Sequence, residues 1–229
     1  MNILREHFQT LASTNDYIKT KRTAGKDLIV TADMQTGGRG TKGRAFSSQK
    51  GGVYLSELRF YENFSAKEAF QIMSRTATAV CKTLCFYGIK PVIKWSNDIF
   101  VNDKKICGIL IENTFLGDKI ASSVVGVGLN VCNALEEELA EIAITMQQAT
   151  GKTFSVEEVR ERLIRELQRA HTMDEYLSYI GYLGRRVTLI LGDERIPATL
   201  VSVETDGKLR AETENGERLF SSAEVSLRI

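Results

Sequence analysis

Thr31-Ala-Asp-Met-Gln-Thr-Gly-Gly-Arg-Gly-Thr-Lys-Gly-Arg-Ala-Phe-Ser-Ser48 is the stretch on which the interpretation of this chain depends. It holds four glycines together with the cations Arg39, Lys42 and Arg44. Glycine lets backbone N–H groups approach a ligand without steric cost, and the cations add positive charge. We therefore predict a loop that closes over an anion such as a phosphate or a carboxylate. The alternative is a surface loop with solvated cations.

Strands are predicted on both sides of this loop. Residues 27–32 are apolar and β-branched, and residues 52–60 alternate between apolar and polar. Gly38–Gly43 matches G-x-G-x-x-G, but a dinucleotide-binding motif opens a helix, whereas a strand follows here. The P-loop pattern G-x-x-x-x-G-K-[ST] does not occur. The loop is thus expected to connect two strands.

The remaining patterns predict an α+β protein with two domains. Residues 65–88 have helical spacing, and residues 92–131 form closely spaced strands whose short turns require antiparallel pairing. Helices are predicted over 135–150 and over 156 to about 179. Short strands with turn signals follow, so we expect domains at 1–181 and 182–229, the second a small β-barrel.

Composition narrows the function class. The 229 residues are 43% hydrophobic and 26% charged, and the formal net charge is +1, so nothing indicates nucleic-acid binding. The four cysteines lack C-x-x-C spacing, which favours reduced thiols over a metal site or a disulfide. We see no apolar signal segment and no membrane-spanning run. A cytoplasmic protein without membrane contact is expected.

A second cluster carries chemistry. Lys94 lies between Ile93 and Trp95, and a lysine in an apolar strand is costly to desolvate unless an anion meets it. Lys105 begins another apolar strand, and Gly108 would let a ligand lie against the backbone. The segment around Lys94 and the segment around Lys105 are each, taken alone, equally compatible with a turn that carries a solvated lysine. Together with the glycine-rich loop, both favour an anion site.

Five motifs in order resemble those of the biotin protein ligases. They are Ser13–Asn15, Gln35–Arg44, Lys94–Asp98, Lys104–Glu112 and Gly126–Asn130. The resemblance covers most of residues 11–131 and is specific. It implies a mixed, largely antiparallel sheet with helices, related to class II aminoacyl-tRNA synthetases, and an SH3-like barrel at the C-terminus.

The resemblance also implies an activity. Biotin and ATP would form biotinyl-5′-AMP and pyrophosphate, and a lysine of a biotin carboxyl carrier domain, such as that of acetyl-CoA carboxylase, would then take the biotinyl group. Mg²⁺ would be carried by the ATP phosphates, without a metal site that the sequence defines. The resemblance allows a homodimer. A lipoate or octanoate ligase of the same fold is the alternative.

Residue roles follow from the same resemblance. Catalytic roles fall to the cations Lys105, Arg44 and Lys94. Substrate binding is expected from Ser13, Thr14, Asn15, Gln35, Gly38, Arg39, Gly40, Thr41, Lys105 and Gly108. ATP binding is expected from Arg39, Arg44, Phe46, Asn97, Asp98 and Asn130. No enzyme nucleophile is required, because the acyl group is activated as an adenylate.

The chain departs from the family pattern at three positions. Thr41 stands where an arginine is common, which removes a cation from the loop. Phe46 replaces a tryptophan but keeps an aromatic surface for adenine, and Ser96 replaces a proline. No helix-turn-helix module precedes the ligase motifs, so DNA-binding repressor activity is not expected.

Overall fold

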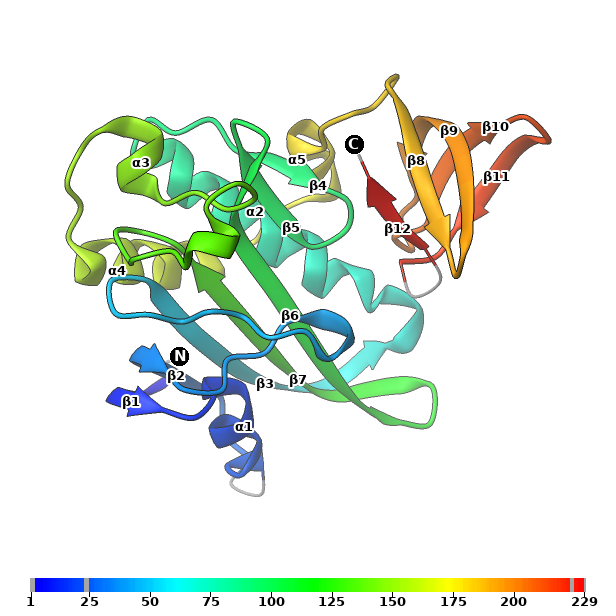
Figure 1. Cartoon of the computed structure of the whole chain (residues 1–229). Coiled ribbons are helices and arrows are strands. Elements are labelled where there is room, and N and C mark those ends of the chain that lie inside the picture. Colours follow the sequence, from blue (N-terminus) through cyan, green and yellow to red (C-terminus); the bar gives the residue numbers. More distant parts are fainter. Residues whose placement is uncertain (1–2, 23–24, 223–224, 229) are drawn as a thin grey trace.

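The computed structural model describes residues 3–22, 25–222 and 225–228 of the chain. A large mixed sheet with helices lies beside a smaller unit made of strands (Figure 1). The first sheet contains β1 (Leu4–Leu11), β2 (Leu28–Gln35), β3 (Val53–Ser65), β4 (Val92–Lys94), β5 (Asp98–Val101), β6 (Lys104–Leu116) and β7 (Lys119–Leu129). The helices are α1 (Thr14–Lys19), α2 (Phe70–Phe86), α3 (Met146–Thr150), α4 (Val156–Leu167) and α5 (Met173–Tyr179).

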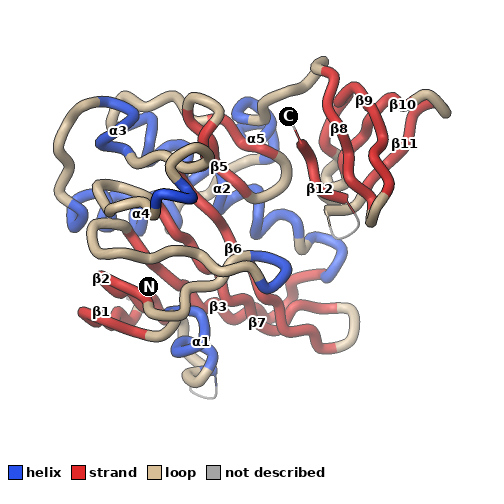
Figure 2. The backbone as a smooth tube through the Cα atoms, viewed as in Figure 1, coloured by secondary structure: helices blue, strands red, loops and turns tan. Residues whose placement is uncertain are grey.

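Strand pairing in the large sheet follows the turns. The order is β1-β2-β3-β7-β6-β5-β4. β1 and β2 pair in parallel across the connection that holds α1, and every other neighbouring pair is antiparallel. Short turns join β4 to β7 in succession, and only antiparallel neighbours can be joined in this way. The predicted antiparallel meander is confirmed, as is a glycine-rich loop between two strands (Figure 2).

The sheet buries both faces because successive side chains of a strand point in opposite directions. Ile29 and Val125 belong to the main core, to which α2, α4 and α5 contribute. The adjacent residues Val30 and Val124 pack instead with Ile18 of α1. Helix α1 therefore covers the face opposite α2, and its N-terminus lies at the end of β1.

The predicted helix over residues 135–150 is wrong. Only a 3₁₀ turn at Glu137–Leu139 and the short α3 form there. The backbone between them runs beside β6: the Lys105 N–H donates to the Ile142 carbonyl at 2.9 Å, and the Ile144 N–H donates to the Lys105 carbonyl at 3.0 Å. Pairing with a strand therefore replaces helical hydrogen bonds in this segment.

The single helix predicted over residues 156–179 is divided into α4 and α5. Thr172 caps α5 through a reciprocal capping box with Glu175, so a new helix begins there. The ring Nε2 of His171 lies 2.9 Å from the Glu166 carbonyl near the end of α4. Among the described residues, no helix is long and apolar enough to cross a membrane.

The C-terminal strands form a separate antiparallel sheet. They are β8 (Arg186–Leu191), β9 (Glu194–Val203), β10 (Leu209–Thr213), β11 (Gly216–Phe220) and β12 (Val225–Arg228), in the order β11-β10-β9-β8-β12. β11 and β12 do not pair with each other within the described residues. The sheet is therefore open there, and the closed barrel expected from the turn pattern is not formed.

The turn between β9 and β10 packs against the part of the chain that forms the large sheet. The buried Trp95 indole donates to the Gly207 carbonyl at 3.0 Å, and the Tyr182 hydroxyl lies 3.2 Å from Asp103 Oδ1. Gly207 has φ +87°, and a Cβ at this position would lie 2.2 Å from the Phe70 ring. The turn thus requires glycine for its backbone conformation and for its contact with α2.

This contact predicts a stability difference between two glycine substitutions. Gly207→Ala should lower the free energy of unfolding by more than about 1 kcal/mol, because strain at positive φ adds to a clash with Phe70. Gly192→Ala is the matched control, since Gly192 has φ +59° but open space where the added methyl group would lie. Thermal unfolding should give a larger fall in Tm for Gly207→Ala. Equal falls would show that the contact with Phe70 contributes nothing.

Candidate active site

A large cavity opens beneath the glycine-rich loop, which we define as residues 36–48. Its volume is about 910 Å³, and its walls come from this loop, from β5–β7 and from the segment 135–143. The predicted site residues that line it are Ser13, Thr14, Asn15, Gln35, Arg39, Gly40, Thr41, Arg44, Phe46, Lys94, Asn97, Asp98, Lys105, Gly108 and Asn130. Residues more than a hundred positions apart therefore meet around one cavity.

Gly38 is the predicted site residue that does not line the cavity. It is buried at the base of the loop, where its carbonyl accepts the Phe46 N–H at 2.9 Å. A Cβ on Gly38 would lie 2.5 Å from both the Phe46 carbonyl oxygen and Ser48 Oγ. The structure thus gives Gly38 a role in closing the loop backbone. A direct contact with a ligand, as expected from the sequence, is not supported by this position.

The ring of Phe46 rests on two paired glycines. Gly108 of β6 lies opposite Gly128 of β7 in the sheet. A Cβ on Gly128 would lie 2.5 Å from the Phe46 ring, and one on Gly108 would lie 3.2 Å from it. Any side chain at these positions would displace the ring, so the glycine pair provides a flat floor for an aromatic group.

Four buried or half-buried polar residues form one end of the cavity. Ser13 caps α1 by accepting the Asp16 N–H at 3.2 Å. Gln35 Oε1 accepts the Thr14 N–H at 2.8 Å, and Gln35 Nε2 donates to Ser48 Oγ at 2.9 Å. Asn15 is 5% exposed and lies in the same cluster. Hydrogen bonds therefore fix these side chains before any ligand arrives.

The lysines lie further along the cavity. Lys105 Nζ is 2.7 Å from Asp98 Oδ1 and 6.0 Å from the centre of the Phe46 ring. Lys94 Nζ lies 5.1 Å from the centre of the Phe100 ring. These two cations come from strands that are neighbours of β5, which explains how separate sequence motifs converge.

Two asparagines help to build the same wall. Asn97 Nδ2 donates to the Ile109 carbonyl at 2.9 Å, which ties the β4–β5 turn to β6. Asn130 is buried and its Oδ1 accepts from Asn133 Nδ2 at 3.2 Å. Both amides line the cavity together with Asp98, and protein partners hold them in place.

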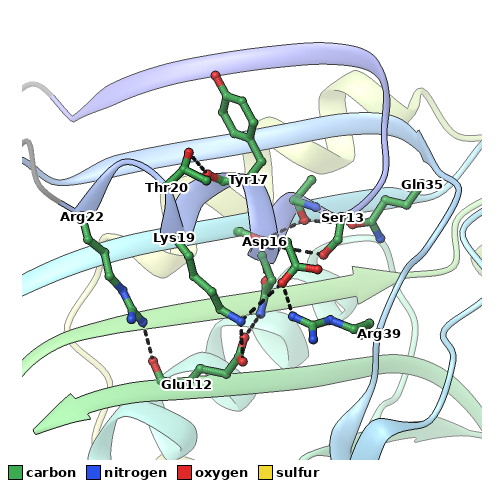
Figure 3. Close-up of polar contacts among 12 residues, drawn as sticks. Ser13, Asp16, Tyr17, Lys19, Thr20, Arg22, Gln35, Arg39 and Glu112 are labelled. Atoms are coloured by element: carbon green, nitrogen blue, oxygen red, sulfur yellow. Dashed lines mark hydrogen bonds and ion pairs between the residues drawn. The ribbon is translucent and has the colours of Figure 1, made fainter.

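The loop cations are held differently from one another. Arg39 pairs with Asp16 of α1 and remains 44% exposed (Figure 3). Arg44 donates from Nη2 to Thr41 Oγ1 at 3.1 Å, so Thr41 is a neutral partner within the loop. The side chain of Lys42 lies outside the described part of the chain. Arg39 therefore ties the loop to α1, while Arg44 stays within the loop.

One wall of the cavity comes from residues outside the sequence motifs. Leu135, Leu139 and Ile142 line it, and Ser47 of the loop donates to Glu136 Oε1 at 2.7 Å. Leu227 of β12 also reaches the cavity. The available signal was weak: apolar residues recur among acidic ones over 135–142, a pattern that resembles an amphipathic helix.

Two further kinds of reactive site were considered for this region, a cysteine nucleophile and a metal-binding cluster. Burial raises the pKa of the Cys107 thiol, which lies on β6 between Lys105 and Gly108. A thiol held in this form is a poor nucleophile. Within the described residues, no group of three His, Cys, Asp or Glu side chains is placed to hold a metal ion.

Two family models match the chain. One, described as the biotin/lipoate A/B protein ligase family, matches residues 7–130. The chain belongs to this family. The other, described as the biotin protein ligase C-terminal domain, matches residues 182–228. The first match contains each of the polar and cationic residues predicted for the site.

Several similar proteins are described as biotin ligases. The bifunctional ligase/repressor BirA of Bacillus subtilis is 30% identical over 221 residues, which cover 89% of this chain and 67% of that protein. The biotin–[acetyl-CoA-carboxylase] ligase of Paracoccus denitrificans is 25% identical, with 86% and 88% covered. The solved structure of the Aquifex aeolicus biotin protein ligase with biotin and ATP is 28% identical, has a TM-score of 0.78 and covers 98% of each chain.

Proposed function

We propose that the chain is an ATP-dependent biotin protein ligase that acts on a biotin carboxyl carrier protein. One observation carries this function: a fixed polar cluster and a set of cations line one and the same cavity. The similarity over nearly the whole of a ligase solved with biotin and ATP supports it. The cavity volume, about 910 Å³, lies at the upper end of the range for small-molecule sites, as two substrates require.

The polar cluster would bind the ureido end of biotin. Ser13, Thr14, Asn15 and Gln35 offer donors and acceptors that are already fixed by protein contacts. Fixed polar groups reduce the entropy that is lost on binding. The valeryl chain of biotin would be directed from this cluster toward Lys105.

The cations would serve the first reaction. A biotin carboxylate oxygen attacks the α-phosphorus of ATP, the bond to the β-phosphate oxygen breaks, and pyrophosphate leaves. Two anions must meet in this step, and Lys105, Lys94, Arg39 and Arg44 would offset their repulsion. Asn97, Asp98, Asn130 and the Phe46 ring would place the nucleotide. Thr41 and Gly40 would line the loop that covers the adenylate.

The second reaction needs no enzyme nucleophile. The neutral ε-amine of the carrier lysine attacks the acyl carbon of biotinyl-5′-AMP, and AMP leaves with the anhydride oxygen. The amide forms after the amine loses a proton. Closure of the loop over the cavity would keep water from the anhydride until the carrier arrives.

Mg²⁺ belongs to this proposal as a companion of ATP. When bound, it would neutralise charge on the phosphates. Asp98 is the carboxylate beside Lys105 in the cavity, and a single carboxylate with substrate phosphates is a common way of holding this ion. The residues present therefore fit an ion that arrives with the nucleotide.

We also propose the domain bounds, the fold type of each domain and a cytoplasmic location. The division would be 1–181 and 182–229, the large sheet would be of the class II aminoacyl-tRNA synthetase type, and the C-terminal strands would be SH3-like. The match of a separate family model to residues 182–228 supports this division. The four cysteines are free, in keeping with a cytoplasmic protein.

The partners are part of the same proposal. The carrier would be that of acetyl-CoA carboxylase, in line with the similarity to the Paracoccus ligase. A homodimer is supported by β6, whose residues 109–116 pair only with β7 among the described strands. Such an edge can accept another strand. Light scattering with and without biotin and ATP would measure the association state.

Modification of a carrier protein tests the function directly. With ATP, Mg²⁺ and biotin, intact mass spectrometry should show the mass of one biotinyl group on the carrier lysine. Lipoate in place of biotin should give no comparable product, and a Lys→Arg carrier is the control for the modified position. Lipoyl transfer at an equal or greater rate would instead favour the lipoate ligase alternative.

A further inference from the structure

Glu112 lies outside the cavity lining but contacts a residue that lines it. It stands on β6, four positions after Gly108, and its Oε2 accepts from Asn15 Nδ2 at 2.9 Å. Its other oxygen, Oε1, accepts from Lys19 Nζ at 2.5 Å. Figure 3 shows Lys19 directed at Glu112 from α1. One carboxylate therefore joins the helix that carries Asn15 to the floor strand of the cavity.

The hydrogen bonds around Asn15 permit one orientation of its amide. Ser56 is fully buried, and its Oγ lies 2.5 Å from Asn15 Oδ1. An ionised carboxylate can only accept hydrogen bonds, so Glu112 must face Nδ2 and not Oδ1. With the amide turned over, Oδ1 would face the carboxylate at close range, which is repulsive. Glu112 thus keeps the Asn15 Nδ2 on its own side and the Oδ1 on the side of Ser56.

The charge of Glu112 is maintained by its partners. Burial acts to raise the pKa of this carboxyl, but the hydrogen bonds from Lys19 and Asn15 outweigh that effect and lower it. The side chain is 32% exposed, so it is neither fully buried nor free in solvent. The carboxylate is therefore an acceptor for Asn15 at neutral pH.

Among the described residues, Glu112 is the acceptor of one Asn15 amide N–H, and the second N–H has no protein acceptor. Its amide lies against Gly126 of β7, where a Cβ would be 2.3 Å from Oδ1. An asparagine amide has two N–H groups, and one of them is donated to Glu112. The other N–H belongs to a side chain that lines the cavity.

We infer that Glu112 is a positioning residue for biotin recognition, which holds the Asn15 amide so that one N–H is presented to an acceptor of the biotin head group. This inference rests on the proposed function and adds to it a residue that touches no substrate. The competing explanation is that Glu112 only anchors α1 to the sheet through Lys19. The two explanations predict opposite outcomes for one pair of substitutions.

The first variant is Glu112→Gln. A glutamine has one acceptor oxygen, for which Asn15 and Lys19 would compete, so the Asn15 amide loses its fixed orientation. We expect the KM for biotin in the exchange of pyrophosphate into ATP to rise about tenfold, the scale of one unsatisfied buried donor. The KM for ATP and kcat should stay within about twofold, because the reacting atoms lie elsewhere.

The second variant adds Lys19→Met to Glu112→Gln. Without the lysine, the glutamine oxygen is left to Asn15, so the KM for biotin should return to within about threefold of the starting protein. A simple anchoring role predicts the reverse, since loss of Lys19 removes what remains of the anchor. Glu175→Gln is the matched control: Glu175 also pairs with a lysine, Lys82, and is 35% exposed, but it lies on α5.

The outcomes separate the two levels of the proposal. An unchanged KM for biotin in Glu112→Gln, or a double variant no better than the single one, would overturn the role of Glu112 while leaving the ligase function intact. Equal rises in the KM for ATP and in the KM for biotin would also overturn it. A starting protein without biotin-dependent exchange would overturn the proposed function and this inference together.

Discussion

Lys105→Ala should reduce the rate of biotinyl-5′-AMP formation by about 10²- to 10³-fold, equivalent to about 3–4 kcal/mol of transition-state stabilisation. Lys105 is the cavity lysine whose Nζ lies 2.7 Å from Asp98, beside the Gly108 floor. Its charge would face the oxygens at which the biotin carboxylate and the α-phosphate meet. Removing a fixed charge from a site of charge development costs more than removing an ordinary binding contact. Single-turnover formation of adenylate measures this step.

The neighbouring lysine supplies a control for this prediction. Lys104 precedes Lys105 on β6, but its Nζ donates to the Ala140 carbonyl at 2.8 Å and does not line the cavity. Lys104→Ala should therefore leave adenylate formation within about threefold. A normal rate in Lys105→Ala, or equal losses in both variants, would remove Lys105 from the mechanism.

Arg39→Ala should let biotinyl-5′-AMP escape before transfer, with a release rate at least about tenfold higher, because charge-assisted contacts of the kind it loses are worth about 1.5–3 kcal/mol. Arg39 joins the loop to Asp16 of α1 and lines the cavity. Its loss removes a charge that would meet the adenylate and a tie that holds the loop. Thr41 adds no charge to replace it.

Escape of the adenylate can be followed by its reaction with unrelated lysines. Mass spectrometry of a protein mixture should show more biotinylated bystander lysines with Arg39→Ala than with the unchanged enzyme. Arg75→Ala is the control, because Arg75 is an exposed arginine on α2 that contacts Gln71. Labelling confined to the carrier lysine in the Arg39 variant would contradict this role for the loop.

Local sequence signals were sufficient to predict the site residues that lie in recognisable motifs. The glycine-rich loop follows a strand and precedes another, so its chemistry could be inferred before its position was known. Lys94 and Lys105 each stand in an apolar strand, and antiparallel pairing of β4, β5 and β6 brings them to one cavity. Their convergence follows from strand pairing, which the short turns dictate.

Non-local contacts account for what the sequence did not reveal. Gly38 matches the motif but serves the loop backbone, and this depends on Phe46 and Ser48 folding back onto it. The segment 135–143 has an amphipathic pattern, yet it bonds to β6 at Lys105 instead of forming a helix. Glu112 was part of a quoted motif, but its contact with Asn15 bridges residues 97 positions apart. Such pairings are decided by the fold and not by local propensity.

In the proposed function, biotin and ATP react in this cavity to form biotinyl-5′-AMP. The most direct measurement is the biotin-dependent exchange of labelled pyrophosphate into ATP by the purified chain with Mg²⁺. We expect exchange that requires biotin, that lipoate does not support at a comparable rate, and that falls by about 10²-fold or more in Lys105→Ala. Exchange that is absent with biotin, or that proceeds equally well without it, would show that the chain is not a biotin ligase.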